Sequence, residues 1–170
     1  MRFFLALALA AILSMRVAAA DLSVGLELPR LEVAEYHRPY VAIWIETADQ
    51  GVVGNLTVWY DLKLKNNEGT KWLKDMRQWW RKTGRDLALP VDGLSGATRP
   101  PGTHNATFAA ARTPLATLAA GSYVLTIEAA REVGGRELLR IPFDWPLAKG
   151  FAAKAQGAHE LGAITLTAEP

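Results

Sequence analysis

Cysteine is absent from the 170 residues of the chain. Its absence excludes disulfide bonds, thiolate metal sites, c-type haem attachment and a thiol nucleophile. The histidines His37, His104 and His159 stand singly, so a metal site built from protein side chains alone is not expected. The fold must therefore rest on its apolar core, which 50% hydrophobic residues and six tryptophans can supply.

Residues 1–20 have the pattern of a cleavable export signal. Arg2 precedes an apolar run over residues 3–13, and three alanines stand just before Asp21. In a bacterial protein this pattern indicates export to the periplasm. We expect the mature protein to be a single domain of residues 21–170, a length that suits one domain.

The mature chain also has no net charge once the signal is removed. The signal holds two arginines and no acidic residue, so the 19 basic residues become 17, which balance the 17 acidic residues of the chain. A neutral domain is not expected to bind nucleic acid or anionic membranes through its overall charge. No later apolar stretch approaches the roughly 20 residues of a membrane-spanning helix, so no span is expected after cleavage.

Alternation of apolar and polar residues predicts strands over residues 41–46, 56–62 and 123–129, with weaker signals at 22–28 and 164–166. The pair Gly134-Gly135, between the segments 122–133 and 136–145 that would form the two strands, predicts a two-residue type I′ hairpin turn. Six or seven strands without repeated βαβ units predict a mostly-β fold, an immunoglobulin-like antiparallel β-sandwich. The charged residues around the hairpin are expected to form exposed pairs across it; they are Glu128, Arg131, Glu132, Arg136, Glu137 and Arg140.

In residues 71–82 the apolar residues recur with the period of a helix instead. Their apolar positions fall on one face of a short amphipathic helix; they are Trp72, Met76, Trp79 and Trp80. The helix is expected to lie across one sheet, with a solvated basic face, and to end at Gly84. The alternative is that this helix docks a partner or lines a cofactor.

The stretch from Arg85 to Gly121 is rich in Pro, Gly, Ala and Thr and has no sustained period, which is typical of a functional or disordered connection. It contains Asp92-Gly-Leu-Ser95-Gly96-Ala97-Thr98. This segment resembles the acceptor sequence of bacterial proteins that an FAD-dependent FMN transferase modifies, in which an Asp stands three positions before Ser/Thr-Gly-Ala-Thr/Ser.

The resemblance implies that the hydroxyl of Thr98 becomes a phosphoester of FMN. Gly96 and Ala97 keep the approach to that hydroxyl free of bulk, and Asp92 and Ser95 can close turns between side chain and backbone. A threonine hydroxyl is a weak nucleophile, and the resemblance assigns the base and metal that activate the reaction to the transferase. No catalytic residue is therefore expected in this chain.

The resemblance extends over nearly the whole mature chain. The segments YVAIWIE (40–46), KWLKDMRQWWR (71–81), SGATRPPG (95–102) and GSYVLTIEAAREVGGRE (121–137) are similar to a family of predicted periplasmic proteins catalogued as a domain of unknown function. Members of that family carry the flavin acceptor motif and are typically encoded near PepSY-domain transmembrane proteins. The implied activity is electron transfer outside the cytoplasm.

A covalent bond to FMN would replace a phosphate cradle, and the sequence has neither GxGxxG nor a P-loop. The aromatic residues Trp79, Trp80 and Tyr36 are candidates for stacking on the flavin. A cation, Arg99 or one from residues 71–85, would favour the anionic reduced form. His37 or His104 could also reach the flavin, although a histidine on the surface or in a hydrogen bond is the more common case.

The sequence thus predicts a periplasmic electron-transfer flavoprotein that carries FMN on Thr98 and exchanges electrons with a PepSY-type transmembrane reductase. An electron carrier or redox subunit is expected in preference to an independent enzyme. The alternative is a non-redox immunoglobulin-like binding module of the cell envelope, in which the aromatic helix and not Thr98 governs partner capture.

Overall fold

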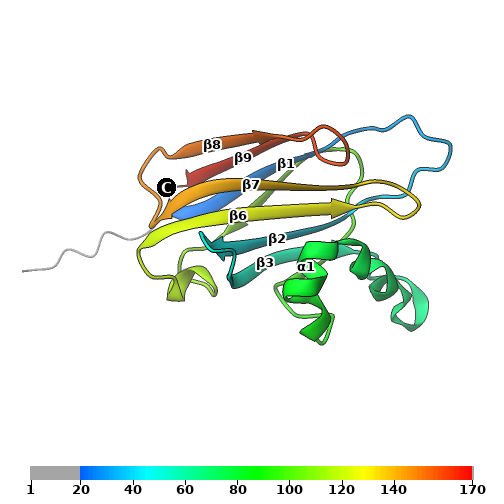
Figure 1. The fold of residues 1–170 in the computed structure, drawn as a ribbon, viewed down its shortest axis with the longest axis horizontal. Coiled ribbons are helices and arrows are strands. Elements are labelled where there is room, and N and C mark those ends of the chain that lie inside the picture. Colours follow the sequence, from blue (N-terminus) through cyan, green and yellow to red (C-terminus); the bar gives the residue numbers. More distant parts are fainter. Residues whose placement is uncertain (1–19, 170) are drawn as a thin grey trace, which may run out of the picture.

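Two β-sheets lie face to face in the protein (Figure 1). The computed structural model describes residues 20–169, and the export signal expected over residues 1–20 lies outside them except for its last residue. The first sheet has the strand order β5-β1-β9-β8 and the second β4-β3-β2-β6-β7. The strands are β1 (Asp21–Leu28), β2 (Tyr40–Thr47), β3 (Val52–Tyr60), β4 (Ser95–Ala97), β5 (Gly102–Phe108), β6 (Gly121–Ala130), β7 (Arg136–Trp145), β8 (Ala152–Gln156) and β9 (Ala163–Glu169).

This arrangement confirms the expected mostly-β sandwich. Each of the strands predicted from alternation is present, but β4, β5 and β8 are additional. Strands β4 and β5 lie in the stretch that was expected to be irregular. All strand pairs are antiparallel except β3 with β4, which is parallel and extends one edge of the second sheet.

The main core fills the space between the sheets. Val41, Ile43 and Ile45 of β2 point into it and are fully buried, as period-two alternation requires. Leu125 and Ile127 of β6 contribute from the neighbouring strand. Each such side chain stabilises the fold by about 1.5–3 kcal/mol relative to an exposed one.

The second sheet is buried on its outer face as well. There Trp44, Val58 and Tyr60 pack under three short helices, η1 (Lys65–Asp75), α1 (Arg77–Lys82) and η2 (Gly84–Asp86). Figure 1 shows these helices gathered below β2 and β3. A strand that is covered on both faces reads as a nearly continuous apolar run, which explains the sequence of β2.

The one expected short amphipathic helix is present as α1, but its expected extent over residues 71–82 is wrong. The chain forms the 3-10 helix η1 up to Asp75, turns at Met76 with ψ of 74°, and then forms the short α1. As a result Leu73 is buried, whereas Trp72 is 37% exposed and does not share the apolar face with Trp79.

The break has a physical cause that lies far away in the sequence. The carboxylate of Glu128 on β6 accepts hydrogen bonds from the backbone N–H groups of Gln78 (3.1 Å) and Trp79 (2.8 Å). These are first-turn donors that an uninterrupted helix would have satisfied internally. Gly84 follows the end of α1 as expected, but its stronger constraint is contact: a Cβ there would lie 2.5 Å from the Trp79 ring.

The β6–β7 hairpin is present, but the two-residue type I′ turn is wrong. Residues 131–135 connect the strands, and the positive φ is at Val133 (51°) rather than at either glycine. The two glycines are needed because they flank a buried ion pair, Arg131 with Glu160, at 3.1 Å. A Cβ on Gly134 would lie 2.5 Å from the Arg131 guanidinium, and one on Gly135 would lie 2.5 Å from Glu160 Oε1.

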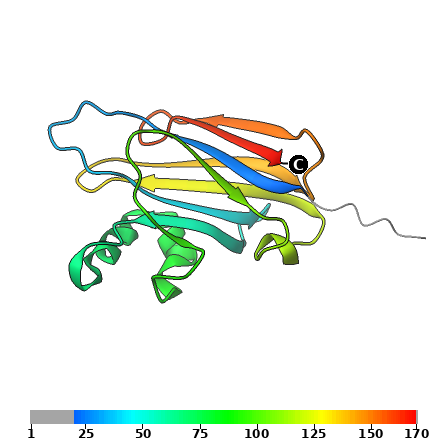
Figure 2. The same cartoon turned by 180° about the vertical axis from the view of Figure 1, so that it is seen from behind.

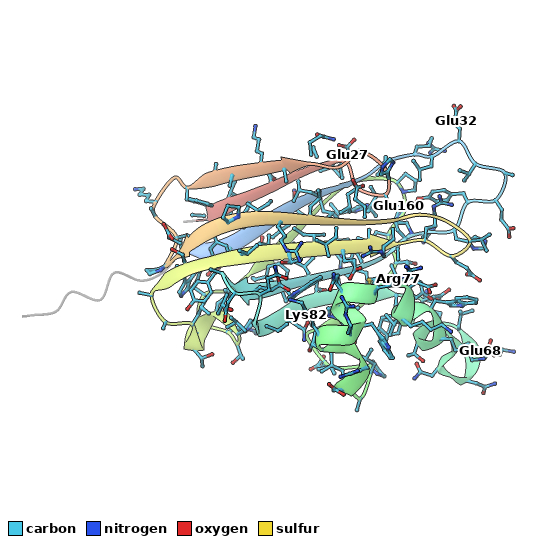
Figure 3. All side chains as sticks on the ribbon, in the orientation of Figure 1. Glu27, Glu32, Glu68, Arg77, Lys82 and Glu160 are labelled. Atoms are coloured by element: carbon cyan, nitrogen blue, oxygen red, sulfur yellow. The ribbon has the colours of Figure 1, made fainter. Side chains whose placement is uncertain are left out.

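The expectation of exposed pairs around this hairpin is also wrong. Glu128 is fully buried, and Arg131 is 8% exposed. Of the six charged residues expected to pair across the hairpin, Arg136 and Glu128 form an ion pair at 2.7 Å. Arg131 pairs instead with Glu160, which reaches the hairpin from the β8–β9 connection (Figure 3). The others bind elsewhere: Glu132 lies near His37, Arg140 near Glu46, and Glu137 accepts backbone N–H groups of residues 158, 159 and 161.

A second buried carboxylate, Glu46 on β2, also ties the helices to the sheet. It accepts hydrogen bonds from Trp44 Nε1 (2.8 Å), Thr126 Oγ1 (3.1 Å) and Lys82 Nζ (2.7 Å), and Figure 3 marks Lys82 on α1. Burial raises the pKa of Glu46, but the hydrogen bonds from Lys82 and Trp44 outweigh burial. The pKa of Glu46 therefore lies below its ordinary value of 4.5.

Replacing the carboxylate that anchors α1 should be costly. Glu128→Ala leaves two backbone donors at the start of α1 without partners, and we expect a loss of about 2–3 kcal/mol in the free energy of unfolding. Urea unfolding, monitored by circular dichroism, measures this loss of stability. Glu32→Ala, an exposed glutamate, is the control and should change stability by less than about 0.5 kcal/mol. Equal stability of the two variants would contradict the anchoring.

Acid should weaken the fold through Glu46. A carboxylate whose pKa is depressed in the folded state stabilises the protein above its unfolded pKa and loses that contribution as pH falls through its folded pKa. We therefore expect the free energy of unfolding to fall as the pH drops below 4.5, and Glu46→Gln to flatten that dependence. Urea unfolding at a series of pH values tests it, with Glu32→Gln as the control for losing one carboxylate. An unchanged slope in Glu46→Gln would refute the expectation.

Candidate functional site

The acceptor-like segment forms an ordered edge of the second sheet. Strand β4 pairs with the end of β3, with Ser95 opposite Val58 and Ala97 opposite Tyr60. The pairing is bounded by two hydrogen bonds, from Val58 N–H to the Leu94 carbonyl (2.9 Å) and from Thr98 N–H to the Tyr60 carbonyl (3.2 Å). Thr98 is thus the first residue beyond the strand, held at a fixed place by its backbone.

A compact turn leads into β4. Ser95 Oγ accepts the backbone N–H of Val91 (3.0 Å), and Ser95 N–H donates to the Val91 carbonyl (2.9 Å). Gly93 lies in this turn with φ of 72°, a conformation that favours glycine. Ser95 therefore closes a turn as expected, while Asp92 is exposed to solvent. Figure 2 shows the segment after the helices passing from the second sheet to β5 of the first.

Trp59 supports the segment from the side of the sandwich core. The backbone of Gly96 lies against its indole, where a Cβ would be 2.9 Å from Cδ1. The Arg99 guanidinium lies over the same ring at 4.7 Å from its centroid, a cation–π contact. His104 meets the ring edge-on at 6.2 Å and hydrogen-bonds the Pro100 carbonyl (2.8 Å). Trp59 thus fixes the chain on both sides of Thr98.

Thr98 lies in the wall of a cavity of about 320 Å³ at one end of the sandwich. It is half-buried, so its side chain is not sealed inside the apolar core. The cavity forms where β3, β4 and β6 end and β2 begins. Its lining combines apolar, cationic and acidic residues: His37, Arg38, Tyr40, Asp61, Lys63, Leu64, Ala97, Thr98 and Glu132.

The charged residues of the cavity differ in whether they lie close to an opposite charge. His37 lies between two carboxylates, with Nε2 3.1 Å from Glu35 and Nδ1 3.7 Å from Glu132. Within residues 20–169, Arg38 and Lys63 take part in no ion pair. The cavity thus offers two unengaged cations to an anionic group at Thr98, such as a phosphoester.

The aromatic residues proposed as stacking partners do not line this cavity. Trp79 is fully buried under α1 and donates from Nε1 to Asn55 Oδ1 (2.8 Å), and Trp80 packs beside it. Tyr36 is half-buried in the β1–β2 connection; burial raises its pKa, and the nearby charge of Arg131 opposes that rise. Arg99 is held against Trp59.

Sequence reasoning missed the residues that do line the cavity, apart from Thr98, Ala97 and His37. A signal was available for two of them. Tyr40 immediately precedes the strand predicted over residues 41–46 and Asp61 lies near the end of the one predicted over residues 56–62, and neighbouring antiparallel strands bring such ends together. Burial raises the pKa of the Tyr40 hydroxyl, while hydrogen bonding with the backbone of Asp61 acts in the opposite direction.

A protein-family model described as "Predicted periplasmic protein (DUF2271)" matches residues 21–163. The chain belongs to this family. The DUF2271 match confirms the resemblance to predicted periplasmic proteins and the periplasmic location expected from the N-terminal segment. No curated protein and no solved structure matches the chain. Within residues 20–169, no helix of this DUF2271 protein has both the length and the apolar composition needed to span a membrane.

The contact of Gly96 with Trp59 can be tested directly. Gly96→Ala places a methyl group 2.9 Å from Trp59 Cδ1, so β4 should detach from β3 more readily. We expect amide exchange of Val58 and Thr98 to accelerate about tenfold, as measured by hydrogen–deuterium exchange. Gly121→Ala is the control, since an added Cβ there meets nothing closer than 3.8 Å. Unchanged protection in Gly96→Ala would show that the contact does not constrain the strand.

Proposed function

We propose that this protein is a periplasmic electron-transfer flavoprotein that carries FMN as a phosphoester on Thr98. The observation that supports the proposal best is the position of Thr98: it follows an edge strand held by backbone hydrogen bonds and lies in the wall of a cavity. The site fits the group, because the hydroxyl residue is accessible, a cavity adjoins it, and two cations that form no ion pair with residues 20–169 stand near.

The attachment requires a second enzyme. In the proposed transfer, Thr98 Oγ1 attacks the phosphorus on the FMN side of the FAD pyrophosphate, the P–O bond to the AMP phosphate breaks, and AMP leaves. The hydroxyl proton passes to a base of the transferase, since an unassisted threonine is a weak nucleophile. This chain contributes the acceptor and its presentation: Ser95 closes the preceding turn and Trp59 holds the flanking backbone.

Covalent attachment explains why no phosphate cradle is needed. Bound flavin supplies the capacity to accept and donate electrons, and the protein positions it and sets its electrostatic surroundings. In this proposal Arg38 and Lys63 offset the charge of the phosphoester. The partner in electron exchange is a PepSY-type transmembrane reductase, as the family resemblance implies.

A second candidate, an envelope-binding module without redox activity, is favoured by the surface of the helices. Residues 65–86 hold seven basic and three acidic residues, and Trp72 (37% exposed) and Leu64 (41%) are exposed beside them. Since Trp79 is fully buried, its replacement would act on stability. Trp72→Ala is therefore the variant that tests partner capture by this surface.

Thr98 can be tested as the attachment site by intact-mass analysis. After co-expression with an FAD-dependent FMN transferase in a bacterial periplasm, we expect one FMN-sized mass increase and flavin fluorescence in a denaturing gel. Thr98→Ala should lose both, and Thr98→Ser, which keeps a hydroxyl, should retain part of the modification.

Thr103→Ala is the matched control, since this exposed threonine lies five residues downstream on β5. It should be modified as fully as the wild type. An unmodified wild-type protein alongside a modified reference acceptor would refute the flavoprotein proposal and favour the binding module.

A further inference from the structure

We infer that the cavity beside Thr98 is the seat of the flavin ring, with Tyr40 as its aromatic contact and Arg38 and Lys63 as the cations that raise its reduction potential. The inference rests on the proposed attachment of FMN to Thr98. It adds the position of the ring and the residues that affect its reduction potential. Tyr40 takes the place of Trp79, Trp80 and Tyr36 as the aromatic candidate.

The size and the walls of the cavity suit a flavin ring. Its volume of about 320 Å³ falls at the lower end of the roughly 300–1,000 Å³ typical of small-molecule sites. Leu64, Ala97 and the ring of Tyr40 supply apolar wall, whereas Arg38 and Lys63 supply polar wall. The isoalloxazine has the same division, with a dimethylbenzene edge and a polar pyrimidine edge. Because Thr98 is itself part of the wall, a ring tethered there starts at the cavity.

Tyr40 is well placed to be a fixed contact. It is the one Tyr, Trp or Phe among the residues that line the cavity, and it is only 9% exposed. Its ring meets the fully buried ring of Tyr60 edge-on, with centroids 6.4 Å apart. A ring held by the core loses little conformational entropy when a ligand packs against the part of the residue that lines the cavity.

The lining holds two cations, Arg38 and Lys63, and two carboxylates, Asp61 and Glu132, and the carboxylates have partners of their own. The acidic residues are partly engaged, since Glu132 lies near His37 and Asp61 Oδ1 accepts the backbone N–H of Lys63 at 3.1 Å. Arg38 and Lys63 are both exposed at the rim and take part in no ion pair within the described residues. Two-electron reduction of FMN with uptake of one proton leaves a negative charge on the ring, which nearby cations stabilise.

Fluorescence lifetime of the loaded protein tests the contact with Tyr40. A phenol in contact with an excited flavin donates an electron that then returns, which shortens the lifetime without net chemistry. Tyr40→Phe keeps the shape of the side chain and removes the phenol, so we expect the lifetime to lengthen at least threefold. Tyr36→Phe is the matched control and should leave the lifetime unchanged. The extent of loading is checked by mass in each sample.

Potentiometry of the loaded protein tests the two cations. The double variant Arg38→Gln/Lys63→Gln should lower the equilibrium constant for two-electron reduction about tenfold, a shift of about 30 mV to lower potential. Lys149→Gln/Lys154→Gln removes the same charge from exposed positions in and before β8, outside the cavity lining, and should shift the constant by less than twofold.

The outcomes separate this inference from the proposed function. A wild-type protein that acquires no FMN overturns both. A fully loaded protein whose lifetime is the same in Tyr40→Phe and the wild type overturns the seat in the cavity and leaves attachment standing. Equal potential shifts in the two double variants would likewise overturn the assignment of Arg38 and Lys63.

Discussion

Burial of the second sheet on both faces is the constraint on which the rest of the structure depends. Strand β2 packs Val41, Ile43 and Ile45 into the sandwich and Trp44 under the helices, so no face of it is left to water. Because helices this short are unstable in isolation, they depend on tertiary contacts with the sheet. The buried carboxylates Glu46 and Glu128 complete the attachment by bonding to Lys82 and to the backbone at the start of α1.

The site follows from the edge of that same sheet. Strand β3 is paired with β2 on one side, and β4 occupies its other side for three residues. This pairing places Thr98 next to the ends of β2 and β6, from which Tyr40 and the Glu132 region approach. Residues widely separated along the chain thereby form one cavity.

The sequence predicts those features that depend on local pattern. Alternation locates β2, β3 and β6 because one or both faces of each are buried, and the motif ending in Thr98 predicts a candidate site, which stays a prediction. The helix over residues 71–82 could not be read correctly, because Glu128, about 50 residues away, satisfies donors that a helix would otherwise use. The Gly134-Gly135 turn fails for a similar reason, since Glu160 lies against the hairpin. Short strands such as β4, with three residues, carry too few positions for a period to appear.

The short length of β4 has a consequence for aggregation through the edge of the second sheet. The outermost strand of a sheet exposes backbone groups that can recruit another chain and begin aggregation. A strand of three residues, bounded by a tight turn on one side and Pro100-Pro101 soon after it on the other, offers only a short row of such groups. The sheet can therefore leave this border uncovered, as the proposed modification of Thr98 requires, and still remain a poor template for growth into fibres.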